Sequence, residues 1–331
     1  MCSPYTLGDG QHVAKLATPD PSTSPPGGFK PWFLELGTWA IDDIGDNPCR
    51  FSPGFVNVSL GHESWTENVW DWLHKWIETG GNQFIHPQLY FDTGLPQCLQ
   101  DAWATLTAYF SKTAQNTHIV MGILEQRMNH LVCASTSLMT TPTLQSIDYL
   151  ARTQALFIYH YLCLYDGSIR QRALAEKNML ILLTWCQQLW QSATFDAYLE
   201  SVTQETPEDN LPGHSDQGVA MRHWKAWILT ESVRRTWLVC TSTLAAYFRQ
   251  RDGFNQCIGE IRFTASKGLW EATSLAMWAR LASTKDPLFV HSLHVDELLS
   301  TARYSDVGDF TTTFMTLLMG TEKVRSWAAS S

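Results

Sequence analysis

The sequence lacks the short motifs that identify most nucleotide-binding and metal-binding proteins. Its eight cysteines are scattered along the chain, and no two of them form a C-x-x-C pair. This spacing argues against zinc knuckles and thioredoxin-like redox sites. The glycine patterns G-x-G-x-x-G, G-x-x-x-x-G-K-[ST] and G-x-S-x-G are absent as well, so dinucleotide-binding, P-loop and α/β-hydrolase functions have no support.

Basic residues and long apolar runs are also scarce. Lys and Arg number 23 against 32 Asp and Glu, and the formal net charge of −9 argues against an ordinary nucleic-acid-binding surface. The N-terminal residues MCSPYTLGDGQ lack the basic start and apolar core of a signal peptide. The most apolar run, residues 155–165, is too short to span a bilayer. We therefore expect a soluble protein with reduced thiols, nuclear or cytoplasmic and not secreted, with no membrane or direct nucleic-acid partner.

Composition divides the chain into three parts. Residues 1–31 are rich in Pro, Ser, Thr and Gly, which is typical of a flexible tail. In residues 32–63, apolar side chains are interrupted by Gly and Pro, so we expect an irregular segment that packs on the domain. Residues 64–320 are expected to form a single globular domain. A polar loop at 203–218 is its main internal break.

Apolar residues recur at helical spacing in eight segments after the irregular part. The expected helices cover 64–79, 95–110, 116–130, 143–165, 170–190, 219–250, 265–281 and 306–319. Ser64 and Glu67 match a capping box at the start of the first of them, and Gly80 is expected to end it. Sustained period-two alternation is absent, so no strands are expected. The predicted fold class is all-α, a multi-helix array of antiparallel helices.

One stretch, WKAWILTESVRRT at 224–236, combines tryptophans with charge on one helical face. At 100° per residue, Glu231 lies at the centre of an apolar stripe that contains Trp224 and Trp227, and Arg235 follows one turn later. Arg234 lies on the flank of the stripe. A carboxylate and a guanidinium on an apolar face are costly to desolvate unless they satisfy each other. The pattern therefore predicts a buried ion pair, which is either a structural clamp or the floor of a polar site.

Four segments together resemble a known family. They are FIHP at 84–87, ARTQALFIYHYLCLYDG at 151–167, WKAWILTESVRRT at 224–236 and LWEATSLAMWA at 269–279. Their order and spacing resemble the fungal-specific regulatory (middle-homology) domain of zinc-binuclear-cluster transcription factors over roughly residues 64–320. The resemblance implies an all-helical domain that acts in regulation or effector sensing.

The chain departs from that family at its N-terminal side. The DNA-binding module of such factors needs six clustered cysteines with basic residues between them. Only Cys2 and Cys49 precede residue 64 here, and they lack metal-ligand spacing. Direct DNA binding is therefore not carried over, and the chain is interpreted as the regulatory part standing alone.

Three functions remain open from the sequence. The first is a transcription-factor-like regulator without direct DNA binding, which controls a fungal secondary-metabolite pathway through other regulatory proteins or a small apolar metabolite. The second is a cofactor-free, metal-independent cyclase or isomerase that acts on such a metabolite in an aromatic-lined pocket. The third is an inert or truncated relic. The chain could form a homodimer under any of these functions. Each function is inferred by analogy, because a fold does not by itself determine a function.

The enzyme alternative assigns roles to particular residues. The candidate catalytic groups are Glu231, His160 and Asp166. Glu231 is the main candidate, because a carboxylate between an apolar face and an arginine has a tunable pKa. The candidate ligand-binding residues are Trp224, Trp227, Arg235, Tyr161 and His223.

Each of these residues also has a structural interpretation. Glu231 with the neighbouring arginines would be a clamp, His160 a core histidine, and Asp166 the residue that closes a turn. The tryptophans at helical spacing would belong to the hydrophobic core, and His86 before Pro87 would form a hydrogen bond to a backbone atom. No cofactor or metal is expected. His291 and His294 in HSLHVDE are only a weak pattern for a metal site.

Overall fold

Ten α-helices make up most of the chain that the structure describes. The structure is a computed structural model that describes residues 31–41, 58–137, 144–204, 216–253 and 259–331. The helices are α1 (Val58–Thr79), α2 (Gln97–Phe110), α3 (Thr117–Ser137), α4 (Ser146–Tyr165), α5 (Ile169–Gln204), α6 (Asp216–Asp252), α7 (Leu275–Thr284), α8 (Leu298–Thr301), α9 (Asp309–Met319) and α10 (Thr321–Ser330). The predicted all-α fold class is confirmed.

The first helix is longer than its sequence pattern indicates. Helix α1 begins at or before Val58, so Ser64 lies inside the helix and its carbonyl accepts a bond from the Asn68 side chain at 2.7 Å. The predicted capping box at Ser64 is therefore wrong. Gly61 lies inside α1, and a Cβ at this position would be 2.7 Å from the Thr316 carbonyl oxygen. Glycine thus lets α1 approach α9 closely. Gly80, with φ of 76°, ends α1 as expected.

A small two-stranded sheet replaces part of a predicted helix. Strand β1 (Arg262–Thr264) pairs antiparallel with β2 (Phe289–His291), with Phe263 opposite Val290. The expected helix at 265–281 is wrong in its first half, because α7 begins only at Leu275 behind the N-cap Ser274. Strands of three residues are too short to show period-two alternation, which explains why the sequence predicts none.

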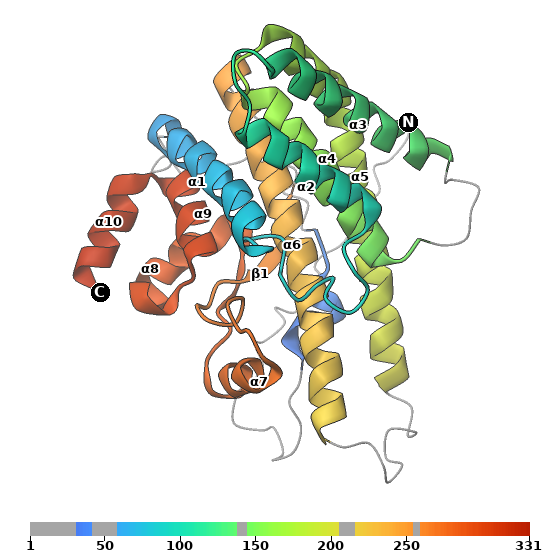
Figure 1. Cartoon of the computed structure of the whole chain (residues 1–331). Coiled ribbons are helices and arrows are strands. Elements are labelled where there is room, and N and C mark those ends of the chain that lie inside the picture. Colours follow the sequence, from blue (N-terminus) through green and yellow to red (C-terminus); the bar gives the residue numbers. More distant parts are fainter. Residues whose placement is uncertain (1–30, 42–57, 138–143, 205–215, 254–258) are drawn as a thin grey trace, which may run out of the picture. The chain divides into compact units, whose positions relative to one another are not determined.

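Helix α6 runs through the middle of the described helices (Figure 1). It packs against α1, α4, α5, α7, β1 and the short 3-10 helix η1 (Trp32–Leu34). Helix α4 runs along α5, and its residues from Leu150 to Leu164 are almost all buried. A charged side chain on the covered faces of α6 therefore has no route to bulk water and must find its partners inside the protein.

The described residues 31–41 of the N-terminal segment pack on the helical body, whereas residues 58–63, which were expected to be irregular, belong to α1. Helices η1 and η2 (Leu36–Thr38) contact α5, and Phe33 and Trp39 are buried. Three stretches lie outside the described residues: residues 42–57, residues 1–30 of the predicted tail at 1–31, and residues 205–215 of the predicted loop at 203–218. The remaining short elements are the 3-10 helices η5 (Ser292–Glu297) and η6 (Tyr304–Asp306).

The cysteines and the helix lengths add two findings. Five described cysteines are free thiols, and Cys163, Cys186 and Cys240 among them are buried like small apolar side chains. None of the helices in the described ranges combines the length and the apolar run that crossing a bilayer requires.

Candidate functional site

The predicted ion pair on α6 is present and buried. Nε of Arg235 donates to Oε1 of Glu231 at 3.0 Å, and the two side chains are 3% and 0% exposed. The helix places them on one face because they are four residues apart. A buried pair of this kind is stable only if its remaining donors and acceptors are also satisfied. The surroundings of both groups therefore decide what the pair does.

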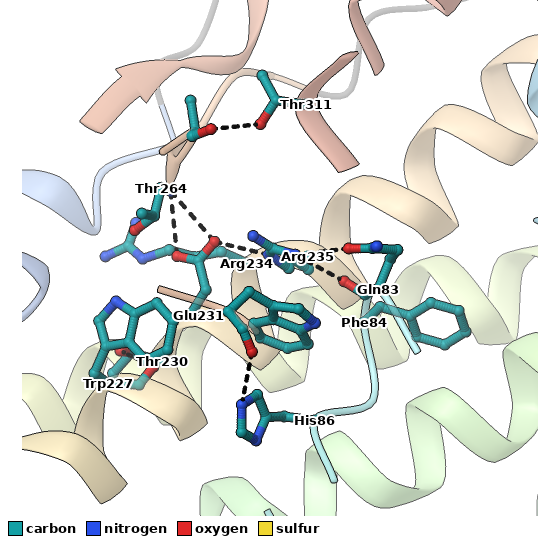
Figure 2. A network of polar contacts seen from close by, with 12 residues as sticks. Gln83, Phe84, His86, Trp227, Thr230, Glu231, Arg234, Arg235, Thr264 and Thr311 are labelled. Carbon is teal, nitrogen blue, oxygen red and sulfur yellow. Dashed lines mark hydrogen bonds and ion pairs between the residues drawn. The ribbon is translucent and has the colours of Figure 1, made fainter. Parts of the chain in front are cut away.

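Both ends of the pair are held by backbone from distant parts of the chain (Figure 2). The backbone N–H of Thr264 in β1 donates to both carboxylate oxygens of Glu231, at 3.3 and 3.2 Å. Nη1 of Arg235 donates to the carbonyl and to Oε1 of Gln83, at 3.2 and 3.3 Å. The Arg235 guanidinium also lies 4.1 Å from the Trp270 ring centre. The pair thus joins α6 to β1 and to the loop after α1.

Arg234 is buried as well, although its helical position is on the flank of the apolar stripe. Its Nη1 donates to the carbonyls of Thr38 and Arg262, at 2.9 and 2.8 Å. Its Nη2 reaches the Phe33 carbonyl at 3.3 Å, and its guanidinium stacks 4.1 Å from the Trp39 ring centre. The irregular N-terminal segment covers this flank, which helical periodicity alone does not indicate.

Among the described residues, neutral carbonyl oxygens and ring faces, and no bonded carboxylate, surround the charge of Arg234. Burial lowers its pKa to about 9, with Glu231 opposing the shift and Arg262 adding to it. The guanidinium therefore stays protonated at neutral pH. A planar fork with five N–H donors suits this task, because it can bind several backbone carbonyls at once.

His86 fixes the loop that supplies Gln83. Its Nδ1 accepts a hydrogen bond from the Gln88 backbone N–H at 3.1 Å, so the ring proton is on Nε2 and is donated to the Trp270 carbonyl at 3.1 Å. Burial lowers the pKa of His86 to about 4, the Trp270 carbonyl opposes this shift, and Arg235 adds to it. The predicted backbone bonding of His86 is confirmed, and the neutral ring is the form that fits.

Both candidate ligand-binding tryptophans pack among other apolar side chains. The cluster consists of Phe33, Leu34, Trp224, Trp227, Ile228, Leu269, Trp270, Ala272 and Trp278. Trp227 is fully buried, with its ring centre 5.9 Å from that of Trp278 and 6.3 Å from that of Trp270. These contacts hold α7 and the N-terminal segment to α6. A ligand-binding role for Trp224, Trp227 and Arg235 stays a prediction.

The other candidate residues lie in separate contacts. His160 is buried on α4, where burial lowers its pKa to about 4 and the Ala175 backbone opposes the shift. The Tyr161 hydroxyl donates to the Thr66 carbonyl at 2.8 Å, and burial raises the pKa of Tyr161. Among the described residues, no hydrogen bond or ion pair joins either side chain to Glu231.

Asp166 and His223 are placed at the ends of helices. Asp166 is the C-cap of α4, where it accepts a bond from the Tyr109 hydroxyl at 2.8 Å and pairs with Lys112. His223 lies half-buried near the start of α6, and burial lowers its pKa, with Glu200 opposing the shift. The structure therefore brings together Glu231 and Arg235 but not the proposed catalytic set. The enzyme alternative stays a prediction.

The two histidines near the C-terminal part lie beside a carboxylate. Glu260 oxygens are 3.6 Å from Nδ1 of His291 and 3.8 Å from Nε2 of His294. Arg262 donates to Nε2 of His291 at 2.8 Å, which occupies that ring nitrogen. In the part of the chain that the structure describes, no group of three or more His, Cys, Asp or Glu side chains is arranged to hold a metal ion.

Sequence reasoning missed the partners of the two arginines. Thr38, Gln83 and Thr264 supply mainly backbone atoms, and every residue type carries those atoms. Their residue identities therefore give no signal for the contact. The weak signal that did exist was two adjacent arginines next to an apolar stripe, which indicates that two separate neighbours must supply acceptors.

Comparison with known proteins gives one informative match. Transcription factor gsfR2 of Penicillium aethiopicum is 30% identical to this chain over 261 residues, which are 77% of this chain and 58% of that protein. The chain is similar to a fungal transcription factor. It spans less than two thirds of the relative's length, so the similarity describes only part of that protein. No family model and no solved structure matches the chain.

Proposed function

We propose that this chain is a transcription-factor-like regulatory protein of a fungus, which controls secondary-metabolite genes through partner or effector binding. The observation that carries the proposal is the 30% identity to a fungal transcription factor over 77% of the chain. The all-helical fold agrees with the resemblance of its helix series to a fungal regulatory domain. The role in secondary metabolism rests on that resemblance.

We also propose that this chain does not itself bind duplex DNA. DNA binding requires clustered Lys and Arg that face the phosphates. Here the net charge is −9, and several basic side chains are paired with acids, as Arg127 is with Asp101 and Arg170 with Glu125. Arg234 and Arg235 are buried. These placements support contact with DNA through a partner.

The arginine and glutamate network on α6 has a supporting role in this proposal. It joins the N-terminal segment, the loop with Gln83 and β1 to one helix, and its carboxylate is already bonded by Arg235 and Thr264. Such a network fixes the relative positions of elements and leaves other surfaces free to bind partners or effectors.

A gene deletion in the host fungus tests the regulatory role. We expect loss of the chain to change transcript levels of a set of biosynthetic genes, and the parent gene to restore them. RNA sequencing of the deletion, the complemented and the parent strains measures this effect. Identical transcript profiles in the deletion and parent strains would contradict the proposal.

A mobility-shift experiment tests the statement about DNA. The purified chain is incubated with duplex promoter DNA of the affected genes at low and physiological salt. We expect no sequence-specific complex. Tight, salt-sensitive binding to one duplex would show that the chain contacts DNA directly.

A further inference from the structure

Helices α2, α3 and α4 pack on one another (Figure 1). The residues that line a cavity come from these three helices and the segments just before α2 and α4, and none of them belongs to the α6 network. The volume of the cavity is about 580 Å³, which suits a small organic molecule. Much of its wall is apolar and includes Leu131, Ala134 and Ala151. Cys98 also lines it, and burial raises the pKa of this thiol to about 11, so it is uncharged.

The cavity wall carries two arginines with different surroundings. Arg127 pairs with the Asp101 carboxylate at 3.4 Å and donates to the Asp101 carbonyl at 2.6 Å. Arg152 donates to Oε1 of Gln188 at 2.5 Å, but it has no carboxylate partner among the described residues, and its buried Nε has no hydrogen-bond partner there. A partly buried guanidinium that keeps an N–H donor without a partner is a costly arrangement.

Asp148, the acidic residue four positions before Arg152 on α4, caps the start of the helix instead of pairing with Arg152. Asp148 lies one turn before Arg152 and also lines the cavity, but its Oδ2 accepts the Gln145 backbone N–H at 3.1 Å as part of a capping box. Its carboxylate stabilises the start of α4. The positive charge of Arg152 is therefore left for a group that enters the cavity.

The Arg152 guanidinium is also held in a fixed orientation. Its Cζ lies 4.4 Å from the centre of the Tyr149 ring and 4.8 Å from that of the Trp185 ring. Together with the bond to Gln188, these contacts restrict the rotation of a side chain that would otherwise be mobile. A pre-oriented fork loses little conformational entropy when it binds an anion.

We propose that this cavity binds a mostly apolar small molecule with one anionic group, and that the anion pairs with Arg152. The apolar wall would contact the apolar part of the ligand, while the guanidinium selects for the negative charge. Its role as an effector site rests on the proposed regulatory function. The binding itself can be tested on the purified chain and is separate from any effect on transcripts.

The test uses two probes of nearly the same shape. 1-Anilinonaphthalene-8-sulfonate is anionic, and N-phenyl-1-naphthylamine lacks the sulfonate. Fluorescence titrations on the full chain measure the affinity and stoichiometry of each probe. We expect one anionic probe to bind per chain. Arg152→Gln should weaken its binding about tenfold, because a charge-assisted contact is lost, and should change the binding of the neutral probe less than about twofold.

Two further variants control for position and charge. Ala134→Phe fills the cavity and should abolish binding of both probes, whereas Arg280→Gln removes an exposed charge on α7 and should leave both affinities at the parent values. Circular dichroism of each variant checks that the fold is kept. Equal binding of the anionic probe by parent, Arg152→Gln and Ala134→Phe would overturn the proposal, as would equal losses in Arg152→Gln and Arg280→Gln.

Discussion

The α6 network and the α2–α4 cavity both place an arginine over aromatic rings, but among the described residues only Arg235, and not Arg152, forms an ion pair with a carboxylate. Arg235 stacks on Trp270 and bonds to Glu231, whose oxygens also accept the Thr264 N–H. Arg152 stacks on Tyr149 and Trp185 with only an amide oxygen as its bonded partner among the described residues. An arginine that is paired with a carboxylate stabilises the fold, whereas an arginine without such a partner beside a cavity is suited to binding an anionic ligand.

Removal of the carboxylate from the α6 network is expected to have the largest effect on stability. Glu231→Ala leaves Arg235 buried without an anion, so we expect the free energy of unfolding to fall by about 3–5 kcal/mol and the melting temperature by roughly 10 °C. Urea denaturation and thermal melting measure the two quantities.

A surface pair provides the matched control for that loss. Oε1 of Glu322 lies 3.4 Å from Nη1 of Arg325, and both side chains are largely exposed. Glu322→Ala should leave the melting temperature near that of the parent, because exposed pairs contribute little. If the two alanine variants melted at the same temperature, Glu231 would not be a structural clamp.

Acidification sharpens the comparison through His86, which supports the Gln83 loop. Its folded-state pKa of about 4 lies below the ordinary value of 6.5, so as the pH falls between these values the unfolded chain takes up a proton that the folded chain excludes. Stability that is full above pH 6.5 is therefore lost toward pH 4, by up to about 3 kcal/mol from this group.

Urea denaturation at stepped pH measures this dependence. His86→Gln keeps an amide donor and acceptor but has no group that titrates in this range. We expect its stability to fall less steeply than that of the parent between pH 6.5 and 4. Parallel pH profiles for the two proteins would show that His86 is not responsible. His160, whose pKa is also about 4, contributes in the same direction in both proteins.

A smaller effect is expected from a change that keeps the charge of Arg234. Arg234→Lys replaces a fork that binds the Thr38, Arg262 and Phe33 carbonyls with a single ammonium group. We expect a loss of about 2 kcal/mol, because some of the acceptors lose their donors. Hydrogen exchange should accelerate in residues 33–39 while residues 83–86 stay protected. Equal acceleration in both segments would mean that the two arginines do not hold separate parts of the chain.

The buried ion pair on α6 could be predicted from the sequence, because helical geometry relates residues that are close in the chain. The spacing of Glu231 and Arg235 within an apolar stripe is enough to predict an inward-facing pair. The start of α1 was missed, since Gly61 looks like a helix break until α9 is known to pack against it. The β1–β2 pair was missed because three-residue strands depend on tertiary pairing more than on their own pattern.

The cavity could not be predicted for a different reason. Its wall combines residues from three helices, and what decides whether space remains between them is side-chain packing, which a single sequence does not show. Arg152 looks like an ordinary surface charge on α4 in the helical pattern. Its lack of a carboxylate partner is visible only once Asp148 is seen to cap the helix.

Thermal melting with and without the anionic naphthalene probe tests the central distinction most directly. The parent, Glu231→Ala and Arg152→Gln are melted side by side and followed by circular dichroism. We predict that Glu231→Ala melts far lower than the parent but is stabilised by the probe as the parent is. Arg152→Gln should melt within a few degrees of the parent and gain much less stability from the probe. A Glu231→Ala variant that melts like the parent, or an Arg152→Gln variant that responds fully to the probe, would contradict the account.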